Sequence, residues 1–430
     1  MTAGRWEPPR LRIGGEDDEE RHATWLELFF DLVFVVAVAE LAHKLSDNIS
    51  PSGFFAFVLL FVGVWWAWVG ETFYDTRFDT DDPVHRLLTV LQMFAVVALA
   101  INVHDGFGAT GTGFALSYVA IRAVLVVQYL RAGRYVPDAR PLTDRFARGF
   151  ALAALLWVMT TLLPSPWRFV LVGVALAVDF GTPIFAGRLH AQLAPSSSHL
   201  PERFGLFTII VLGEAIVAVV QSLASQGWTP PSAVEGLLGL SIAFSLWWIY
   251  FDNLDGTAIQ AARQTGRTGI YQVWLYAHLP LAIGLTAAGV GVEHALASQT
   301  GGVLPAADRW LLCGAVALSL LAIGIIHLAT AAAGSPRCRR SQAMSRIVAA
   351  AATLALAAVG GRLAPIVLVG ILAAIGGSQV ALELRGTLRI RAVGQSGSRA
   401  EDVRQGEGMG QGAVRPGSIA PHQPLTTDDH

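Results

Sequence analysis

The feature that most constrains this chain is a succession of apolar blocks, each about 18–22 residues long, separated by short polar segments. A helix needs about 20 apolar residues to cross the hydrocarbon core of a bilayer. The composition agrees, since 53% of the 430 residues are hydrophobic, 14% are charged and the mean hydropathy is +0.51. A soluble domain carries about 25% charged residues. The sequence therefore excludes a soluble globular or disordered protein and predicts a multi-pass membrane protein.

The number of blocks predicts an all-α integral membrane protein with about twelve transmembrane helices. We place the spans at residues 25–45, 54–73, 87–103, 114–130, 150–163 and 169–186, and at 204–223, 234–251, 270–292, 310–331, 347–360 and 363–384. The fifth and eleventh blocks are short and rich in alanine, so full crossing is least supported for these two.

The arginine distribution predicts the orientation. Basic residues concentrate in the N-terminal segment, the even-numbered loops and the C-terminal segment, and few occur in the odd-numbered loops. Loops on the cytoplasmic side of a membrane carry an excess of Lys and Arg. We therefore expect a protein of the cell membrane with both termini in the cytoplasm.

The two halves of the chain resemble each other. Trp65–Trp66 recurs as Trp247–Trp248, at the same offset that separates Arg21 from Arg203. An even number of helices in each copy gives both copies the same orientation in the membrane. We therefore predict two parallel six-helix repeats, at residues 23–190 and 199–386.

The two ends of the chain differ from the spans in composition. Residues 1–22 mix proline, arginine and acidic residues, and residues 392–430 are rich in glycine, serine, glutamine and charge. Such segments bury too little apolar surface to fold. We expect a disordered cytoplasmic arm at 1–22 and a disordered cytoplasmic tail at 392–430.

Charged residues inside the predicted spans are the main functional candidates. A charged side chain at the bilayer centre costs about 2.5–3.5 kcal/mol on insertion scales, so it has to be paired or face water. Arg122 is the only base that we place deep inside a predicted span. The acids are Glu27, Asp31, Glu71, Asp179 and Glu214.

Two interpretations of these charges remain open. In the first, Arg122 neutralises one acid in a structural ion pair, and the other acids are protonated or reach an interface. In the second, carboxyl groups without a cation exchange protons or bind a cation, because burial favours the neutral form. Asp31 and Glu214, at comparable depth in the two repeats, would then flank a central site.

His278 is a further candidate for the ion pathway. It lies in the ninth span two residues before Pro280, and a proline in a span leaves a backbone carbonyl unpaired, often beside a cavity. His278 either exchanges a proton or faces a cation, or it forms a hydrogen bond with a neighbouring helix.

The loop between the second and third spans carries a charged motif, whose candidate residues are Arg77, Asp79, Asp81 and Asp82. Asp82 followed by Pro83 predicts the N-cap and first residue of the third span. The spacing of Asp75, Asp79 and Asp81 does not match an EF-hand loop. We expect these acids to pair with arginines such as Arg77, Arg86 and those at 131–148, and we predict no metal site.

Enzyme motifs are missing from the sequence. There is no Walker A motif, His-Glu-x-x-His, Gly-x-Ser-x-Gly or Cys-x-x-Cys, and the two cysteines are too few for a cysteine-based metal site. We predict no enzyme, no catalytic residue and no cofactor. The net charge of −2 and the lack of a basic stripe also argue against nucleic acid.

Five segments of the chain resemble the bacterial low temperature requirement A (LtrA) family. The first is Trp-Leu-Glu-Leu-Phe-Phe-Asp at 25–31, and the others lie at 77–82, 202–214, 247–252 and 276–280. The resemblance covers about residues 20–385. That family is named for a growth defect in the cold, so the resemblance implies a link to growth at low temperature. It carries over no catalytic residue, because no biochemical activity is established for the family.

Together these features predict a secondary transporter or ion-conducting protein that uses intramembrane carboxylates. The alternative is a non-transporting membrane sensor or assembly factor whose buried charges are structural. The expected partners are the lipid bilayer and a small ion or proton, and a homodimer is one assembly that the sequence allows. The sequence does not identify the substrate or the coupling ion.

Overall fold

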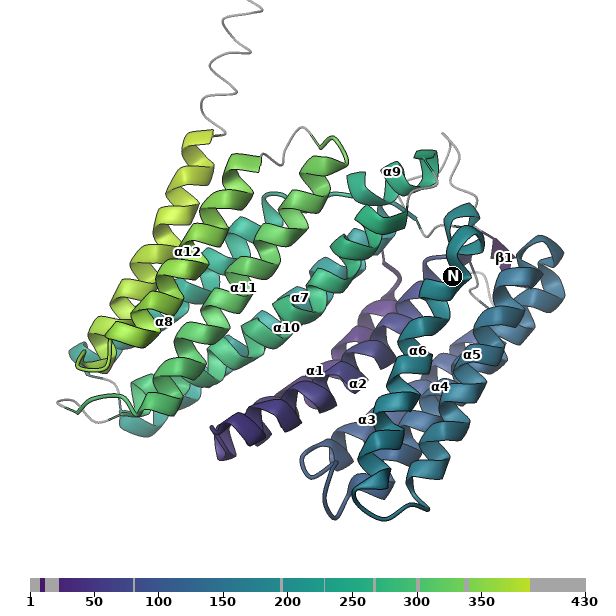
Figure 1. Cartoon of the computed structure of the whole chain (residues 1–430), viewed down its shortest axis with the longest axis horizontal. Coiled ribbons are helices and arrows are strands. Elements are labelled where there is room, and N and C mark those ends of the chain that lie inside the picture. Colours follow the sequence, from purple (N-terminus) through teal and green to yellow (C-terminus); the bar gives the residue numbers. More distant parts are fainter. Residues whose placement is uncertain are drawn as a thin grey trace, which may run out of the picture. The chain divides into compact units, whose positions relative to one another are not determined.

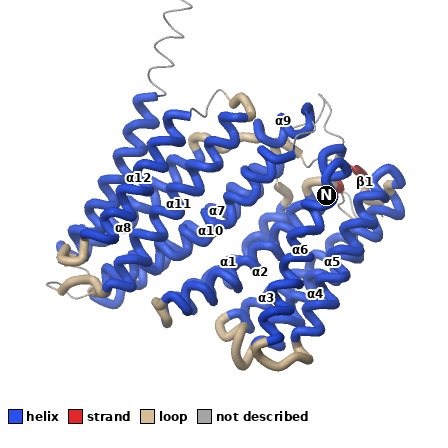
Figure 2. Tube along the Cα trace, in the orientation of Figure 1, coloured by secondary structure: helices blue, strands red, loops and turns tan. Residues whose placement is uncertain are grey.

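The computed structural model describes residues 8–11, 23–79, 82–193, 196–227, 229–265, 268–298, 302–335 and 340–386. These residues are almost entirely helical (Figures 1 and 2). The predicted tail at 392–430 and most of the predicted arm at 1–22 lie outside them. The chain divides into Met1–Val380 and Ala381–His430, and the contacts described below are those within the first unit.

The helices follow one another with short connections. The first half contains α1 (Trp25–Asp47), α2 (Pro51–Asp75), α3 (Pro83–Val103), α4 (Gly111–Tyr135), the 3₁₀ turn η1 (Pro137–Ala139), α5 (Arg140–Thr160) and α6 (Trp167–Gln192). The second half contains α7 (His199–Gln226), α8 (Pro230–Phe251), the short α9 (Thr257–Thr265), α10 (Thr268–Ala297), α11 (Ala306–Ala332), α12 (Arg340–Val359) and a last helix, Pro365–Gly386. Each predicted apolar block overlaps one of the long helices.

Most of these helices have the length and composition of membrane spans. Within the described residues, ten helices are long and apolar enough to cross a membrane. The protein is therefore an all-α, multi-pass membrane protein. α1 and α5 are not among the ten, and α1 carries charged residues along its whole length, from Glu27 to Asp47.

Local sequence signals fix where several helices begin. The Asp82 side chain accepts a hydrogen bond from the His85 backbone N–H at 2.9 Å, and Pro83 occupies the first turn of α3. Thr24 caps α1 in the same way. A short polar side chain satisfies a backbone donor that has no partner within its helix, which stabilises the first turn by about 1 kcal/mol. The predicted start of the third span is confirmed.

α1 and α2 pack against helices from both halves of the chain. α1 contacts α3, α7 and α10, and α2 contacts α4, α7 and α10. Most of the remaining helices pack mainly against their neighbours in sequence, as in the series α3–α4–α5–α6 and α10–α11–α12, but α7 packs mainly against α10. Residues on α1 and α2 therefore meet side chains that lie far away in the sequence.

Large apolar side chains cover the outer faces of helices. On α3, Leu87, Phe94 and Ile101 recur every seven residues and are 69–73% exposed. A soluble monomer rarely exposes such a stripe, whereas a lipid-facing surface requires one.

The two tryptophan pairs that suggested a repeat differ in environment. Trp65 and Trp66 are buried, whereas Trp247 and Trp248 are 41% and 39% exposed. The shared dipeptide therefore does not mark equivalent packing positions.

The N-terminal arm contributes one short ordered element. β1 (Arg10–Leu11) pairs antiparallel with β2 (Phe78–Asp79), just after α2. The predicted disorder of the arm is therefore wrong for these two residues. Backbone hydrogen bonds to the loop after α2 hold them, and Leu11 packs against a buried cluster around Phe78.

Candidate functional site

Arg203 is the centre of a buried ion-pair cluster between α1, α2 and α7. Its guanidinium group donates to both oxygens of Asp31, with Nη2–Oδ1 at 2.7 Å and Nε–Oδ2 at 3.1 Å. Arg203 Nη1 also contacts Glu27 Oε2 at 3.0 Å and Asp75 Oδ2 at 3.5 Å. The Arg203 side chain is completely buried, and the three acids are at most 7% exposed. The two-pronged contact with Asp31 is the strongest geometry for an arginine–carboxylate pair.

Polar side chains around the cluster complete these contacts. Trp68 Nε1 donates to Asp31 Oδ1 at 2.7 Å. His199 Nε2 lies 2.7 Å from Glu27 Oε2, and His85 Nε2 lies 3.8 Å from Asp75 Oδ1. The cluster thus joins the first helices of the chain to α7 through charge-assisted hydrogen bonds.

The prediction that Arg122 is the only deep base is wrong. Arg203 immediately precedes the predicted seventh block, but α7 begins four residues earlier, at His199. This extra turn carries Arg203 into the protein interior. The sequence argument therefore underestimated the positive charge available to the buried acids.

Glu71 lies one turn before Asp75 on α2, so the two carboxyl groups share a face of the helix. Glu71 is fully buried, and its Oε1 accepts a hydrogen bond from Gln128 Nε2 on α4 at 2.7 Å. Its Oε2 has no hydrogen-bond partner among the described residues. Unlike Glu27, Asp31 and Asp75, Glu71 makes no ion pair in the described part of the chain. Arg203 acts on the Glu71 charge only from beyond ion-pair distance.

Arg122 forms a separate, sealed ion pair within the first half. Its Nε lies 2.9 Å from Asp179 Oδ2, and its Nη2 donates to the Tyr118 hydroxyl at 2.7 Å and to the Trp66 carbonyl at 3.0 Å. The Tyr118 hydroxyl also donates to Asp179 Oδ2. Arg122 and Asp179 are completely buried. This is the structural ion pair of the first interpretation, and Asp179 is the acid that it neutralises.

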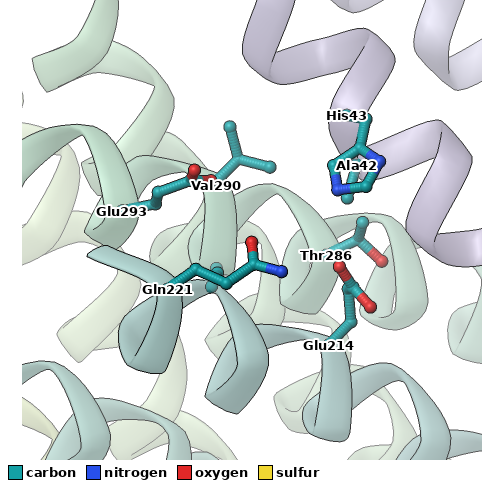
Figure 3. Close-up of a pocket in the computed structure, with 9 residues that line it drawn as sticks. Ala42, His43, Glu214, Gln221, Thr286, Val290 and Glu293 are labelled. Atoms are coloured by element: carbon teal, nitrogen blue, oxygen red, sulfur yellow. The ribbon is translucent and has the colours of Figure 1, made fainter. Parts of the chain in front are cut away.

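Glu214 lines a different, partly open pocket between α1, α7 and α10. The pocket has a cavity volume of about 10 Å³ and is lined by Ala42, His43, Glu214, Ala218, Gln221, Thr286, Gly289, Val290 and Glu293. Figure 3 shows His43, Gln221 and Glu214 pointing toward one another, with Thr286 beside Glu214. Glu214 and Glu293 are each partly exposed.

The structure does not bring Asp31, Arg122 and Glu214 to one central site. Asp31 is bound by Arg203, whereas Glu214 faces His43, twelve residues further along α1. At 1.5 Å per residue, this is a separation of about 18 Å along the helix axis. The same two contacts show that α1 and α7 run side by side in the same direction.

His278 is held by hydrogen bonds on both ring nitrogens. Nδ1 lies 2.8 Å from the Trp274 carbonyl oxygen, and Nε2 lies 3.1 Å from the Tyr250 hydroxyl on α8. The ring also packs edge-on against Phe204. The structure therefore favours the interpretation in which His278 joins neighbouring helices.

The charged loop after α2 is structural where it is described. Arg77 donates to the Leu193 and Phe73 carbonyl oxygens and stacks on Phe73. Asp82 Oδ2 lies 2.5 Å from Arg131 Nη2, so the acid predicted only as the cap of the third span also pairs with the arginine-rich segment. Asp81 and the Asp79 side chain lie outside the described residues. Asp75 pairs with Arg203 and His85, so its expected pairing with the loop arginines is replaced by one with α7 and α3.

Sequence reasoning missed several residues of this site. Gln92 and Gln128 are fully buried amides within apolar blocks, and a search for charged side chains passes over them. Their position inside predicted spans could have identified them, because a polar side chain inside a span needs a partner. Arg203 and His199 were missed because they lie just outside the apolar block that they precede.

Two comparisons with known proteins found bacterial proteins that are similar to this chain. The family model described as bacterial low temperature requirement A protein (LtrA) matches residues 22–381. An uncharacterized protein of Rhizobium meliloti (strain 1021) is 31% identical over 293 residues, which cover 66% of this chain and 71% of the relative.

Proposed function

The chain belongs to the bacterial low temperature requirement A family, and from this premise we propose that it is a secondary transporter or ion-conducting protein of the cell membrane. In this proposal the buried carboxyl groups next to Arg203 exchange a proton or a small cation. The observation that carries the proposal is Glu71, a fully buried carboxyl group without an ion pair among the described residues.

The physical argument starts from the cost of an isolated buried charge. A carboxylate in the protein interior has to be neutralised by a base, a proton or a bound cation. The side chains next to the Glu71 carboxylate are the neutral amides Gln128, which donates to it, and Gln92. One turn away, Asp75 makes the longest of the Arg203 contacts, at 3.5 Å. A proton or cation that reaches Glu71 therefore lies beside the most easily exchanged ion pair of the cluster.

The same proposal includes twelve crossings, arranged as two parallel six-helix repeats with both termini in the cytoplasm. α1 and α5 contain 23 and 21 residues, which is long enough to cross a bilayer core. The parallel course of α1 and α7, the first helix of each proposed repeat, supports the arrangement. The Arg203 cluster then lies where the two repeats meet.

The family name suggests a physiological test. We expect a bacterium that lacks this gene to grow poorly in the cold and normally at its optimal temperature. Complementation with the wild-type gene should restore growth, and complementation with the Glu71→Gln variant should not.

The direct test is ion flux in proteoliposomes. Glu71→Gln keeps the shape and the Gln128 contact but removes the ionisable group. We expect it to abolish flux of protons or monovalent cations, measured with entrapped fluorescent indicators. Glu235→Gln makes the same chemical change on the partly exposed start of α8 and should retain wild-type flux. Equal flux in wild type and Glu71→Gln would refute the proposal.

The sealed Arg122–Asp179 pair favours a second candidate, a non-transporting membrane sensor or assembly factor with structural charges. This candidate predicts that wild-type proteoliposomes show no flux above empty liposomes under any ion gradient. It also predicts that Glu71→Gln changes stability alone.

A further inference from the structure

Four buried polar atoms without hydrogen-bond partners gather around Glu71. They are Glu71 Oε2, Gln92 Nε2 and Oε1, and Gln128 Oε1, and the three side chains are fully buried. They come from α2, α3 and α4. Gln128 Nε2 contacts the Glu71 carboxylate directly at 2.7 Å, and the Gln92 side chain is near enough to act on the same carboxylate although it makes no contact within hydrogen-bond distance.

This arrangement is unusual for a folded protein. The large majority of buried polar side-chain atoms have at least one hydrogen-bond partner, and leaving one without a partner costs about 1–3 kcal/mol. Unpartnered atoms on three helices that converge on one carboxylate therefore point to a ligand that bridges them.

The chemistry of the atoms selects the kind of ligand. One carboxylate oxygen and two amide oxygens are hard ligands, which suit a hard cation and not a soft metal. The site contains a single carboxylate, so one positive charge neutralises it. A water molecule would satisfy the hydrogen bonds but would leave the charge of the carboxylate uncompensated, and a proton would neutralise the carboxylate but would leave the amide oxygens without a ligand. Arg203, which contacts Asp75 one turn along α2, is already held by three carboxyl groups.

We propose that Glu71, Gln92 and Gln128 form a binding site for a small monovalent cation, of which Na⁺ is the probe to test first. The cation replaces the missing partners of the carboxylate and amide oxygens between α2, α3 and α4. The transport role of this cation rests on the proposed function, whereas its binding does not.

The test is the thermal unfolding of the purified full-length protein in detergent. Tm is measured in increasing NaCl, with choline chloride keeping the ionic strength constant, and again with LiCl and KCl. We expect Tm to rise and to saturate with at least one of these cations, because a ligand that binds only the folded state stabilises it. The same Tm in all salts would overturn the proposal.

Two variants locate the site. Gln92→Leu removes two unpartnered polar atoms and should fold at least as well as the wild type in choline, but it should weaken the cation-dependent rise in Tm. Glu71→Gln should abolish that rise, and the control Glu235→Gln should keep it. A full rise in both Gln92→Leu and Glu71→Gln would show that the cation binds elsewhere and would overturn the assignment.

The flux assay separates this proposal from the proposed function. A cation-dependent Tm that is lost in Glu71→Gln, together with no flux in wild-type liposomes, would leave the site standing and refute the transport role. Proton flux that is lost in Glu71→Gln, together with a Tm independent of the cation, would refute the cation site and leave proton exchange standing.

Discussion

Arg203→Met tests the ion-pair cluster that joins α1 and α2 to α7. Methionine keeps an unbranched side chain of moderate length but removes the guanidinium contacts to Asp31, Glu27 and Asp75. Breaking a buried ion pair by removing one partner costs about 3–5 kcal/mol, because the remaining charges stay buried. All these groups are at most 7% exposed, so solvent provides little screening.

The matched control is Arg140→Met. Arg140 Nε lies 3.7 Å from Asp144 Oδ2 four residues along α5, and the two side chains are 71% and 41% exposed. Exposed helix pairs of this kind contribute about 0.3–0.5 kcal/mol. The two arginine variants should therefore differ about tenfold in their effect on the free energy of unfolding.

Unfolding by SDS titration, followed by tryptophan fluorescence, measures both effects. Asp31→Asn in the Arg203→Met background should restore part of the lost stability, because the amide does not need a cation, and a double-mutant cycle measures this coupling. The reasoning is refuted if Arg203→Met costs no more than Arg140→Met, or if the Asp31 and Arg203 substitutions are simply additive.

Three further predictions concern neighbouring contacts. Asp179→Asn should destabilise the protein by about 3–5 kcal/mol by leaving Arg122 without its carboxylate, while flux per folded molecule stays at the wild-type value; a selective loss of flux would place this pair in the pathway. Gly70→Ala should cost about 1–3 kcal/mol, since the new Cβ would lie 2.5 Å from Arg122 Nη1 and 2.9 Å from Leu125 Cδ2. Gly63→Ala, whose Cβ would come no closer than 3.5 Å to Phe114, should be neutral or stabilising by up to about 1 kcal/mol, and equal losses in the two variants would contradict the packing argument. Asp82→Ala should cost about 1 kcal/mol more than Asp82→Asn in chemical unfolding, because both remove the ion pair with Arg131 but asparagine keeps a side-chain oxygen that caps α3; equal costs would mean that the cap contributes nothing.

The elements of the fold were predictable because their signals are local. The length of each apolar block indicates a helix. The pair Asp82–Pro83 marks the start of α3, which begins at Pro83. The pairing of Asp82 with Arg131 was not predicted, because the sequence assigned Asp82 to the helix cap and expected Asp75, Asp79 and Asp81 to pair with arginines.

The organisation of the site was less predictable because its contacts are long-range. Asp31 and Arg203 are 172 residues apart in sequence, and neither segment contains a sequence signal that identifies the other as its partner. Asp31 and Glu214 were predicted to flank one site because they lie at comparable depth in their predicted spans. In the structure they lie at different levels of the parallel helices α1 and α7. Gln92 and Gln128 carry no charge, so their role became visible only when α3 and α4 packed against Glu71.

The most direct test of the central claim is a current measurement on a solid-supported membrane. A sudden rise in proton or monovalent cation concentration on one side should produce a transient charge displacement in wild-type proteoliposomes and in Glu235→Gln. The account predicts no displacement above that of protein-free liposomes in Glu71→Gln, reconstituted at the same density. A current of wild-type size in Glu71→Gln would contradict the assignment of Glu71 as the group that exchanges the ion.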